Sequence, residues 1–171
     1  GIDAPSVTVE AHVAPGLPAF TLVGLPETAV RESRDRVRAA ILSSGFEFPP
    51  RRLTVNLAPA DLPKESARFD LAIALAILAA TGQLPASAAE RLAQIECLGE
   101  LSLDGGLRPI RGTLSAARAA RDANRELLLP AEGRREAELI PGVAGRALNH
   151  LAEAVGYLAG EREPDRLCHR P

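Results

Sequence analysis

The sequence predicts an α/β fold of the α+β type, in which helices pack on a mixed sheet. Three observations support this class. A segment near the start alternates apolar and polar residues, a run at 71–80 is wholly apolar, and strand and helix patterns follow each other in the order β-β-α-β-α-β-β-α-β-α-β-α. With 171 residues, 46% of them hydrophobic and 25% charged, the chain has the length and composition of one globular domain.

The first elements are two strands and a helix. Apolar and polar residues alternate over Ser6–Ala14, which predicts a strand with one exposed face that carries His12. After the turn-forming PGLP, Ala19–Leu25 is expected to pair with this strand as a hairpin. Pro26 and Gly45 are typical of the start and the stop of a helix between them. Its apolar residues at helical spacing should pack on the sheet: Val30, Val37 and Ile41.

The middle of the chain contains the most apolar segment. A β-rich segment, Arg51–Pro59, leads into a polar loop over Ala60–Asp70. The segment from about Phe69 to Thr81 is apolar all round, which predicts the central buried helix. A strand over Ile95–Leu103 followed by a turn at Asp104–Gly106 predicts a second hairpin.

The last third alternates short helices and strands. After a short segment at 86–93 in the middle of the chain, the expected elements are the helix Thr113–Ala123, the strand Glu126–Leu129, a helical turn over Arg134–Leu139, the strand Val143–Leu148 and the helix Leu151–Leu158. Residues 160–171 are polar and charged, which predicts a linker or fraying tail after a domain that spans residues 1–159.

Charge and composition exclude several classes of function. The formal net charge of −2 and the isoelectric point near 6.0 give the domain as a whole no general affinity for nucleic acid, although a local basic patch is compatible with them. No uncharged run approaches the ~18 unbroken apolar residues of a membrane span, so we expect no membrane contact. The two cysteines, Cys97 and Cys168, lack a CxxC spacing and cannot form a four-ligand metal site by themselves. We expect a reducing, cytoplasmic location.

Nucleotide binding is also not expected. A phosphate-binding loop needs GxxxxGK followed by Ser or Thr, and Lys64, the only lysine, lies between Pro63 and Glu65. We therefore expect no cofactor and no metal in this chain. The absence of methionine, even at position 1, indicates a piece of a longer protein.

Two long segments carry a family resemblance. The runs PGLPAFTLVGLPETAVRESRDRVRAAILSSGFEFPPRRLTVNLAPADLPKESARFDLAIALAIL and LGELSLDGGLRPIRGTLSAARAA (Pro15–Leu78 and Leu98–Ala120) closely resemble the amino-terminal domain of the ComM/YifB family of magnesium-chelatase-like AAA+ ATPases. The resemblance implies the ribosomal-protein-S5-domain-2-like fold, similar to the proteolytic domain of Lon. It also implies a following AAA+ module that uses ATP and magnesium, assembly into a hexameric ring, and DNA branch migration in natural transformation.

The resemblance to Lon raises the question of proteolysis. Lon-type proteases use a serine nucleophile and a neutral lysine base. The matching segments place Arg68 at the serine position and Leu114 at the lysine position, so we expect no Lon-type catalysis. The alternative, a residual Lon-like serine peptidase, would need another pair, such as Ser66 with Lys64. We expect a non-catalytic accessory domain that assists ring assembly or DNA guidance.

Arginines are the candidates for contact with DNA or with a neighbouring subunit. On the first helix, Arg31, Arg34 and Arg38 lie on one side, but opposite charges four residues apart also make this side a typical solvated face. Arg51 and Arg52 could extend it into one patch. Arg68, beside the first-turn residue Asp70, could form a second group with two downstream arginines. The complete candidate set is Arg31, Arg34, Arg38, Arg51, Arg52, Arg68, Arg108 and Arg111.

Overall fold

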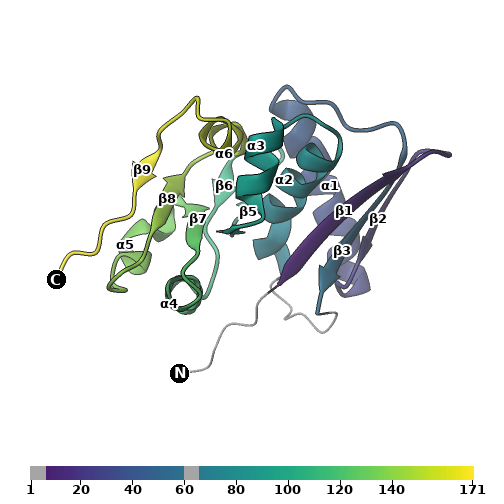
Figure 1. Cartoon of the computed structure of the whole chain (residues 1–171). Coiled ribbons are helices and arrows are strands. Elements are labelled where there is room, and N and C mark those ends of the chain that lie inside the picture. Colours follow the sequence, from purple (N-terminus) through teal and green to yellow (C-terminus); the bar gives the residue numbers. More distant parts are fainter. Residues whose placement is uncertain (1–6, 60–65) are drawn as a thin grey trace.

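The computed structural model describes residues 7–59 and 66–171. One end of the molecule contains a sheet of three strands covered by two helices, and the other contains a sheet of four strands with helices around it (Figure 1). The predicted mixed α/β architecture is confirmed. No helix in the described part of the chain is both long enough and apolar enough to cross a bilayer.

The first sheet has the order β1-β3-β2, from β1 (Thr8–Ala14), β2 (Ala19–Val23) and β3 (Arg52–Ala58). β1 runs antiparallel to β3, and β2 runs parallel to it. The predicted hairpin between the first two strands is therefore wrong, because β3 lies between them. β3 takes the central position because its alternate residues are fully buried, whereas β1 has exposed residues throughout and forms an edge.

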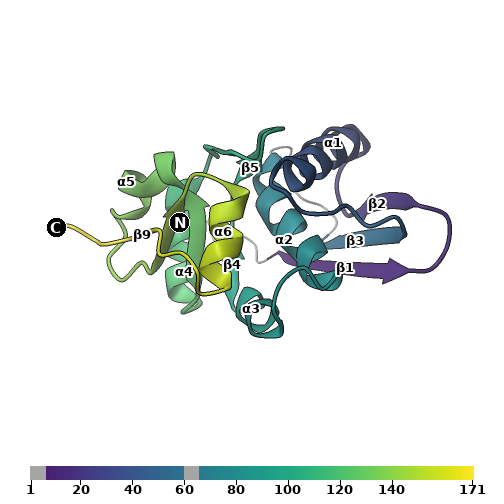
Figure 2. The ribbon, with the colours of Figure 1, turned by 90° about the horizontal axis from the view of Figure 1, so that it is seen from above.

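Two helices cover one face of this sheet, as Figure 2 shows from above. In α1 (Glu27–Ser43), Val37 and Ile41 are fully buried, which confirms the predicted stripe. α2 (Asp70–Ala80) follows a 3₁₀ turn, η1 (Ser66–Phe69), and is buried on most sides. The central buried helix that the sequence predicts is therefore confirmed.

The second sheet has the order β4-β7-β8-β9. β4 (Ile95–Cys97), β7 (Glu126–Pro130) and β8 (Gly145–Leu148) are parallel, and β9 (Asp165–Arg166) is antiparallel to β8. β7 is buried on both faces: Leu127 and Leu129 pack in one core cluster with α4 (Thr113–Asp122). Leu128 packs in the other, with α2 and α6 (Leu151–Leu158). Three shorter elements complete the chain: α3 (Ala86–Leu92), η2 (Ala131–Gly133) and α5 (Arg134–Ala137).

The strand expected over Ile95–Leu103 is broken in two. Leu98 still donates to Leu128 of β7, but the N–H of Gly99 donates to Arg68 and its carbonyl accepts from Leu71, so the chain turns away from β7 toward the start of α2. It continues as β5 (Glu100–Leu101), which pairs with β6 (Leu107–Arg108). The second predicted hairpin is therefore confirmed.

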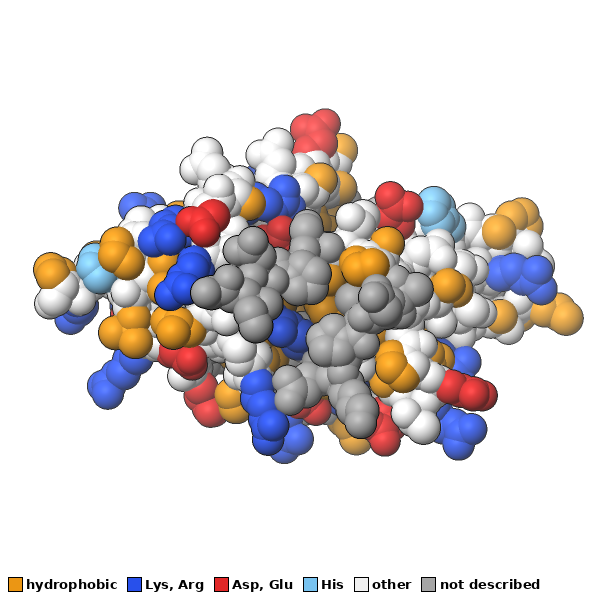
Figure 3. Space-filling model, turned by 90° about the horizontal axis from the view of Figure 1, so that it is seen from below, with side chains coloured by type: hydrophobic (Ala, Val, Ile, Leu, Met, Phe, Trp, Pro, Cys, Tyr) orange, Lys and Arg blue, Asp and Glu red, His pale blue; other side chains and the backbone are white. Residues whose placement is uncertain are grey.

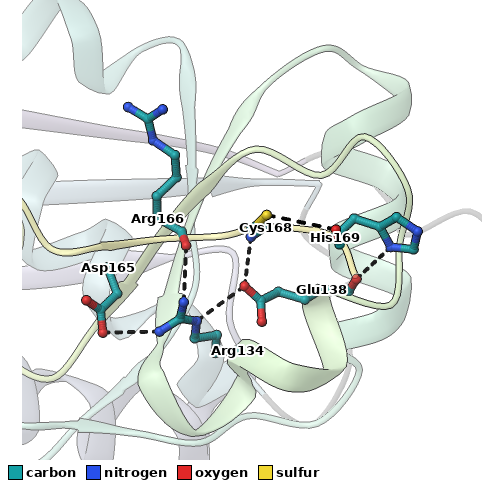
Figure 4. Close-up of polar contacts among 6 residues, drawn as sticks. All are labelled: Arg134, Glu138, Asp165, Arg166, Cys168 and His169. Atoms are coloured by element: carbon teal, nitrogen blue, oxygen red, sulfur yellow. Dashed lines mark hydrogen bonds and ion pairs between the residues drawn. The ribbon is translucent and has the colours of Figure 1, made fainter. Parts of the chain in front are cut away.

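The end of the chain is held against the second sheet rather than fraying (Figure 4). β9 pairs with β8, and Leu167 is 4% exposed in the core cluster that contains α4. Glu138, just after α5, accepts a hydrogen bond from the Cys168 N–H at 2.7 Å. The composition of residues 160–171 suggests a loose tail, but one buried leucine and these bonds fix its position.

Candidate nucleic-acid and subunit interface

Two of the five arginines that the sequence places in one patch contact a pair of aromatic residues, Phe20 and Phe48. We call Arg31, Arg34, Arg38, Arg51 and Arg52 the arginine surface. The rings of Phe20 in β2 and Phe48 before β3 lie with centroids 5.2 Å apart. Because Phe20 lies in β2 and Phe48 lies between α1 and β3, this ring pair brings the helix and the start of β3 to one place.

Two of the three helix arginines contact one of these rings or its backbone. Arg34 Nη1 donates to the Phe20 carbonyl at 3.0 Å, and the guanidinium carbon of Arg38 lies 5.5 Å from the Phe48 ring centroid. Arg34 is half-buried, whereas Arg38 and Arg31 are exposed. Arg34 thus fixes α1 to β2, and the other two keep their charge at the surface.

The strand arginines lie beside the same part of β2. The carbonyl of Arg51 accepts from the Ala19 N–H at 3.2 Å, and Arg52 pairs in register with both Ala19 and Ala14. Both arginine side chains are exposed. The start of β3 thus lies beside the start of β2, but by alternation the Arg52 side chain lies on the face of the sheet opposite the buried Leu53. One continuous patch with α1 therefore stays a prediction.

The alternative explanation, intrahelical ion pairing, holds for one pair. Arg36 and Glu32 lie at 4.0 Å, but neither Glu27 nor Asp35, which are both described, lies within 4.0 Å of Arg31. Arg31 is therefore not neutralised in the way that the spacing suggests. Figure 3 shows one face of the molecule, on which basic side chains form separate groups with acidic ones among them rather than one continuous basic field.

The second predicted group, Arg68, Arg108 and Arg111, is more dispersed. Arg68 is half-buried in η1, and a Cβ atom placed on Gly112 would lie 3.6 Å from its Nη1 atom, so Arg68 approaches the loop that begins α4. This loop contains the exposed Arg111. Arg108 is exposed in β6, opposite Glu100 of β5. Arg68 and Arg111 are thus brought to the same loop, and Arg108 faces an acidic neighbour.

The two positions that match the Lon dyad hold no catalytic pair. Arg68 lies before α2, and Leu114 lies in the first turn of α4, half-buried against the core cluster of that helix. Ser66 is 2% exposed and therefore buried. Lys64, its possible partner, lies outside the described residues.

Sequence reasoning missed a buried charged network at the start of α2. The carboxylate of Asp70 is fully buried and accepts from Arg36 Nε at 2.6 Å, Arg36 Nη2 at 3.2 Å, Ser33 Oγ at 2.8 Å and the Leu101 N–H at 3.1 Å. Burial raises the pKa of Asp70, and the bonds from Arg36, Leu101 and Ser33 oppose this shift. The network joins α1, α2 and β5. The only signal in the sequence is an acidic residue at the start of a wholly apolar helix.

The remaining polar groups do not suggest a metal centre. Within residues 7–59 and 66–171, no three or more His, Cys, Asp or Glu side chains lie close enough together to hold a metal ion. Cys97 is 7% exposed, and burial raises the pKa of its thiol to about 12. A thiol with such a pKa is neutral at physiological pH and does not act as a nucleophile.

Comparison with known proteins shows the family to which the chain belongs. The family model described as subunit ChlI of Mg-chelatase matches residues 9–133. The chain is 46% identical to the uncharacterized protein YifB of Escherichia coli over 97% of its length, and 47% identical to the competence protein ComM of Haemophilus influenzae over 95%. It is also 45% identical, over 94% of its length, to the uncharacterized protein Mb2921c of Mycobacterium bovis.

The chain matches only part of the length of these relatives. The chain covers 32% of YifB and 31% of ComM, so it spans about a third of the length of the curated relatives that it matches. The family match, by contrast, covers well over half of the chain, including both segments around the candidate arginines. The chain therefore belongs to the family of magnesium-chelatase-like proteins described as subunit ChlI, and within it is similar to YifB and ComM.

Proposed function

We propose that this chain is a non-catalytic accessory domain of a ComM-type AAA+ ATPase that forms a hexameric ring in the cytoplasm, and that its arginine surface guides DNA into the ring. The observation that carries the proposal is the position of Arg38 over the Phe48 ring, with Arg31 exposed on the same helix and Arg51 and Arg52 exposed at the start of β3. Guanidinium groups suit phosphate contact, which carries no sequence specificity.

The modest charge of the chain agrees with an accessory role. A net charge of −2 and few clustered arginines predict weak binding by a single domain, because affinity rises with the number of phosphates neutralised. Six copies in a ring would multiply these weak contacts through effective concentration. DNA guidance by this domain is therefore a property of the assembled protein.

ATP and magnesium belong, in this proposal, to the part of the protein outside this chain. The residues of this chain do not fit a phosphate-binding loop, since the described part contains no lysine and Lys64 lies in the sequence PKE. We therefore assign no step of ATP hydrolysis to it. The name of ComM describes it as a competence protein, and we extend this role to the present chain only because the two sequences are similar.

Proteolysis is the function that we reject. Neither Arg68 nor Leu114 can replace the serine and lysine of a Lon-type dyad. The test is casein cleavage by the complete protein with and without ATP. We expect none. Cleavage that disappears in a Ser66→Ala variant, in a preparation free of contaminating protease, would support the peptidase alternative instead.

The proposal is tested by branch migration on a synthetic Holliday junction. In the complete protein, the triple variant Arg31→Ala, Arg38→Ala and Arg52→Ala should slow branch migration. The matched control removes three exposed arginines elsewhere, with the same change of charge: Arg118→Ala, Arg135→Ala and Arg166→Ala. We leave out Arg34, because its bond to Phe20 is structural.

The state of assembly separates DNA guidance from subunit contact. Mass photometry should show the same ring size for both triple variants. A test variant that no longer forms rings would assign the arginine surface to a neighbouring subunit. Equal rates of branch migration in both variants, with rings intact, would show that the arginine surface contacts neither DNA nor a neighbouring subunit.

A further inference from the structure

A cavity between the two sheets is not explained by the proposed function. Its volume is about 410 Å³, within the range of ligand sites. One wall is the start of β1 and the other is β4 with Leu98, and the floor is the side of α2 that carries Ala72 and Ala76. These alanines lie one helical turn apart, and their small side chains leave the space open. The cavity is separate from the arginine surface, which lies at the Phe20–Phe48 pair.

The backbone of β1 presents unused hydrogen-bonding groups to this cavity. The Arg51 carbonyl faces β2, so by alternation the even-numbered residues of β3 face β1. Their partners in register are the even-numbered residues of β1. The N–H and C=O groups of Val7 and Val9 therefore point outward from the sheet, at the wall of the cavity, and within the described residues no strand pairs with this edge.

β4 presents its own outer edge from the other side. The Leu98 N–H donates to β7, so the backbone groups of Ile95 and Cys97 point away from β7. The Ile95 carbonyl accepts from Arg125 Nη2 at 3.3 Å. In the described part of the chain, β4 has no strand neighbour other than β7. Two strand edges thus face one cavity with an apolar floor.

The charge at the rim is negative. Arg125 Nε pairs with Glu96 at 2.7 Å, which neutralises both. Glu10 remains, and among the described residues its carboxylate pairs only with the neighbouring His12 ring, at 3.9 Å. Both Glu10 and the Glu96–Arg125 pair line the cavity. The rim therefore complements a basic residue on the occupant.

We propose that this cavity binds an extended peptide segment of a partner protein as an added strand between β1 and β4. Backbone groups of the segment pair with Val9 and Cys97, its small apolar side chains lie on Ala72 and Ala76, and a flanking basic residue lies near Glu10. Exposed strand edges recognise peptides in this way, with affinity from main-chain bonds and specificity from alternate side chains.

The first test is an NMR titration of the full chain with the acetylated, amidated pentapeptide KVAVA. Amide signals of Val9 and Cys97 should shift together with one affinity. The same peptide carrying N-methyl groups on both alanines should bind about five- to tenfold more weakly, because it lacks two main-chain donors. Equal affinity of the two peptides, or no shift at millimolar peptide, would overturn the proposal.

Two variants locate the site. Ala72→Leu fills the cavity floor and should abolish binding, whereas Ala119→Leu on α4, an equally half-buried helical alanine outside the cavity, should not. Thermal unfolding confirms that both fold. Binding that survives Ala72→Leu would contradict the site. A third outcome is that the chain self-associates, that Ala72→Leu abolishes this self-association, and that peptide has no effect. The occupant of the cavity would then be a second copy of the chain, which would contradict the proposal.

Discussion

Removing the carboxylate of Asp70 should destabilise the fold more than any exposed charge does. This residue is fully buried, and its four hydrogen bonds join α1, α2 and β5. In an Asp70→Ala variant, Ser33 Oγ and the Leu101 N–H lose their acceptor inside the core, and Arg36 loses its close ion pair. Breaking a buried pair by removing one partner costs about 3–5 kcal/mol.

The matched control is Glu32→Ala, which removes an exposed acidic neighbour of Arg36. Its carboxylate is 77% exposed and 4.0 Å from Arg36, so its loss should cost less than about 1 kcal/mol. Ser33→Ala removes only one of the four bonds and should cost about 1 kcal/mol. The series therefore predicts that the loss of stability is largest for Asp70→Ala, smaller for Ser33→Ala and smallest for Glu32→Ala.

Urea unfolding followed by far-ultraviolet circular dichroism measures the free energies of unfolding. For a domain of this size, the Asp70→Ala change corresponds to a fall in Tm of about 6–20 °C. If Asp70→Ala and Glu32→Ala each lowered the free energy of unfolding by the same amount, below about 1 kcal/mol, the Asp70 network would not stabilise the packing of α1, α2 and β5. Our account of this network would then be wrong.

Three further predictions concern other parts of the fold. His150 Nδ1 accepts from the Ala152 N–H and Nε2 binds the Asp104 carbonyl, so His150→Ala should lower the free energy of unfolding by about 1–2 kcal/mol, measured by urea unfolding, and His150→Asn should restore part of it. The Cys97 pKa of about 12 lies above its ordinary value of 9.0, so the neutral thiol contributes stability that is present below pH 9 and lost as the pH rises toward 12. Relative to Cys97→Ala, the wild type should lose up to about 1.4 kcal/mol per pH unit in this window in urea unfolding, and equal slopes would contradict it. Glu138→Ala should increase amide hydrogen exchange at Cys168, because the carboxylate accepts from that N–H, and unchanged exchange would show that β9 alone holds the tail.

The sequence predicts individual elements better than their partners. Alternation in residues 8–14 and the turn before residues 19–23 predict two strands correctly. Their pairing depends on β3, which follows α1 in the sequence and lies between them in the sheet. The wholly apolar run 71–80 is the easiest element to predict, because it is buried whatever surrounds it. The break at Gly99 is not visible in the sequence, since it depends on bonds to Arg68 and Leu71, which are distant along the chain.

The same limit applies to the site. Spacing on one helix is enough to group Arg31 and Arg38, and the start of the next strand suggests Arg51 and Arg52. That Arg34 is fixed to the Phe20 carbonyl is visible only once α1 is placed on β2. The Asp70 network and the cavity between β1 and β4 each require two elements that meet only in the folded chain. Local patterns therefore predict which helix faces and strands carry basic or apolar residues. Tertiary packing decides which of these residues are exposed.

The central claim, that the arginine surface contacts DNA phosphates, is tested most directly by the salt dependence of DNA affinity. The complete protein is titrated with fluorescent duplex DNA at several salt concentrations. In the variant with Arg31, Arg38 and Arg52 changed to alanine, the slope of log affinity against log salt should fall in magnitude by about 2–3 for each domain that contacts the duplex. The Arg118, Arg135 and Arg166 control should keep the wild-type slope, and a test variant that keeps it too would contradict the claim.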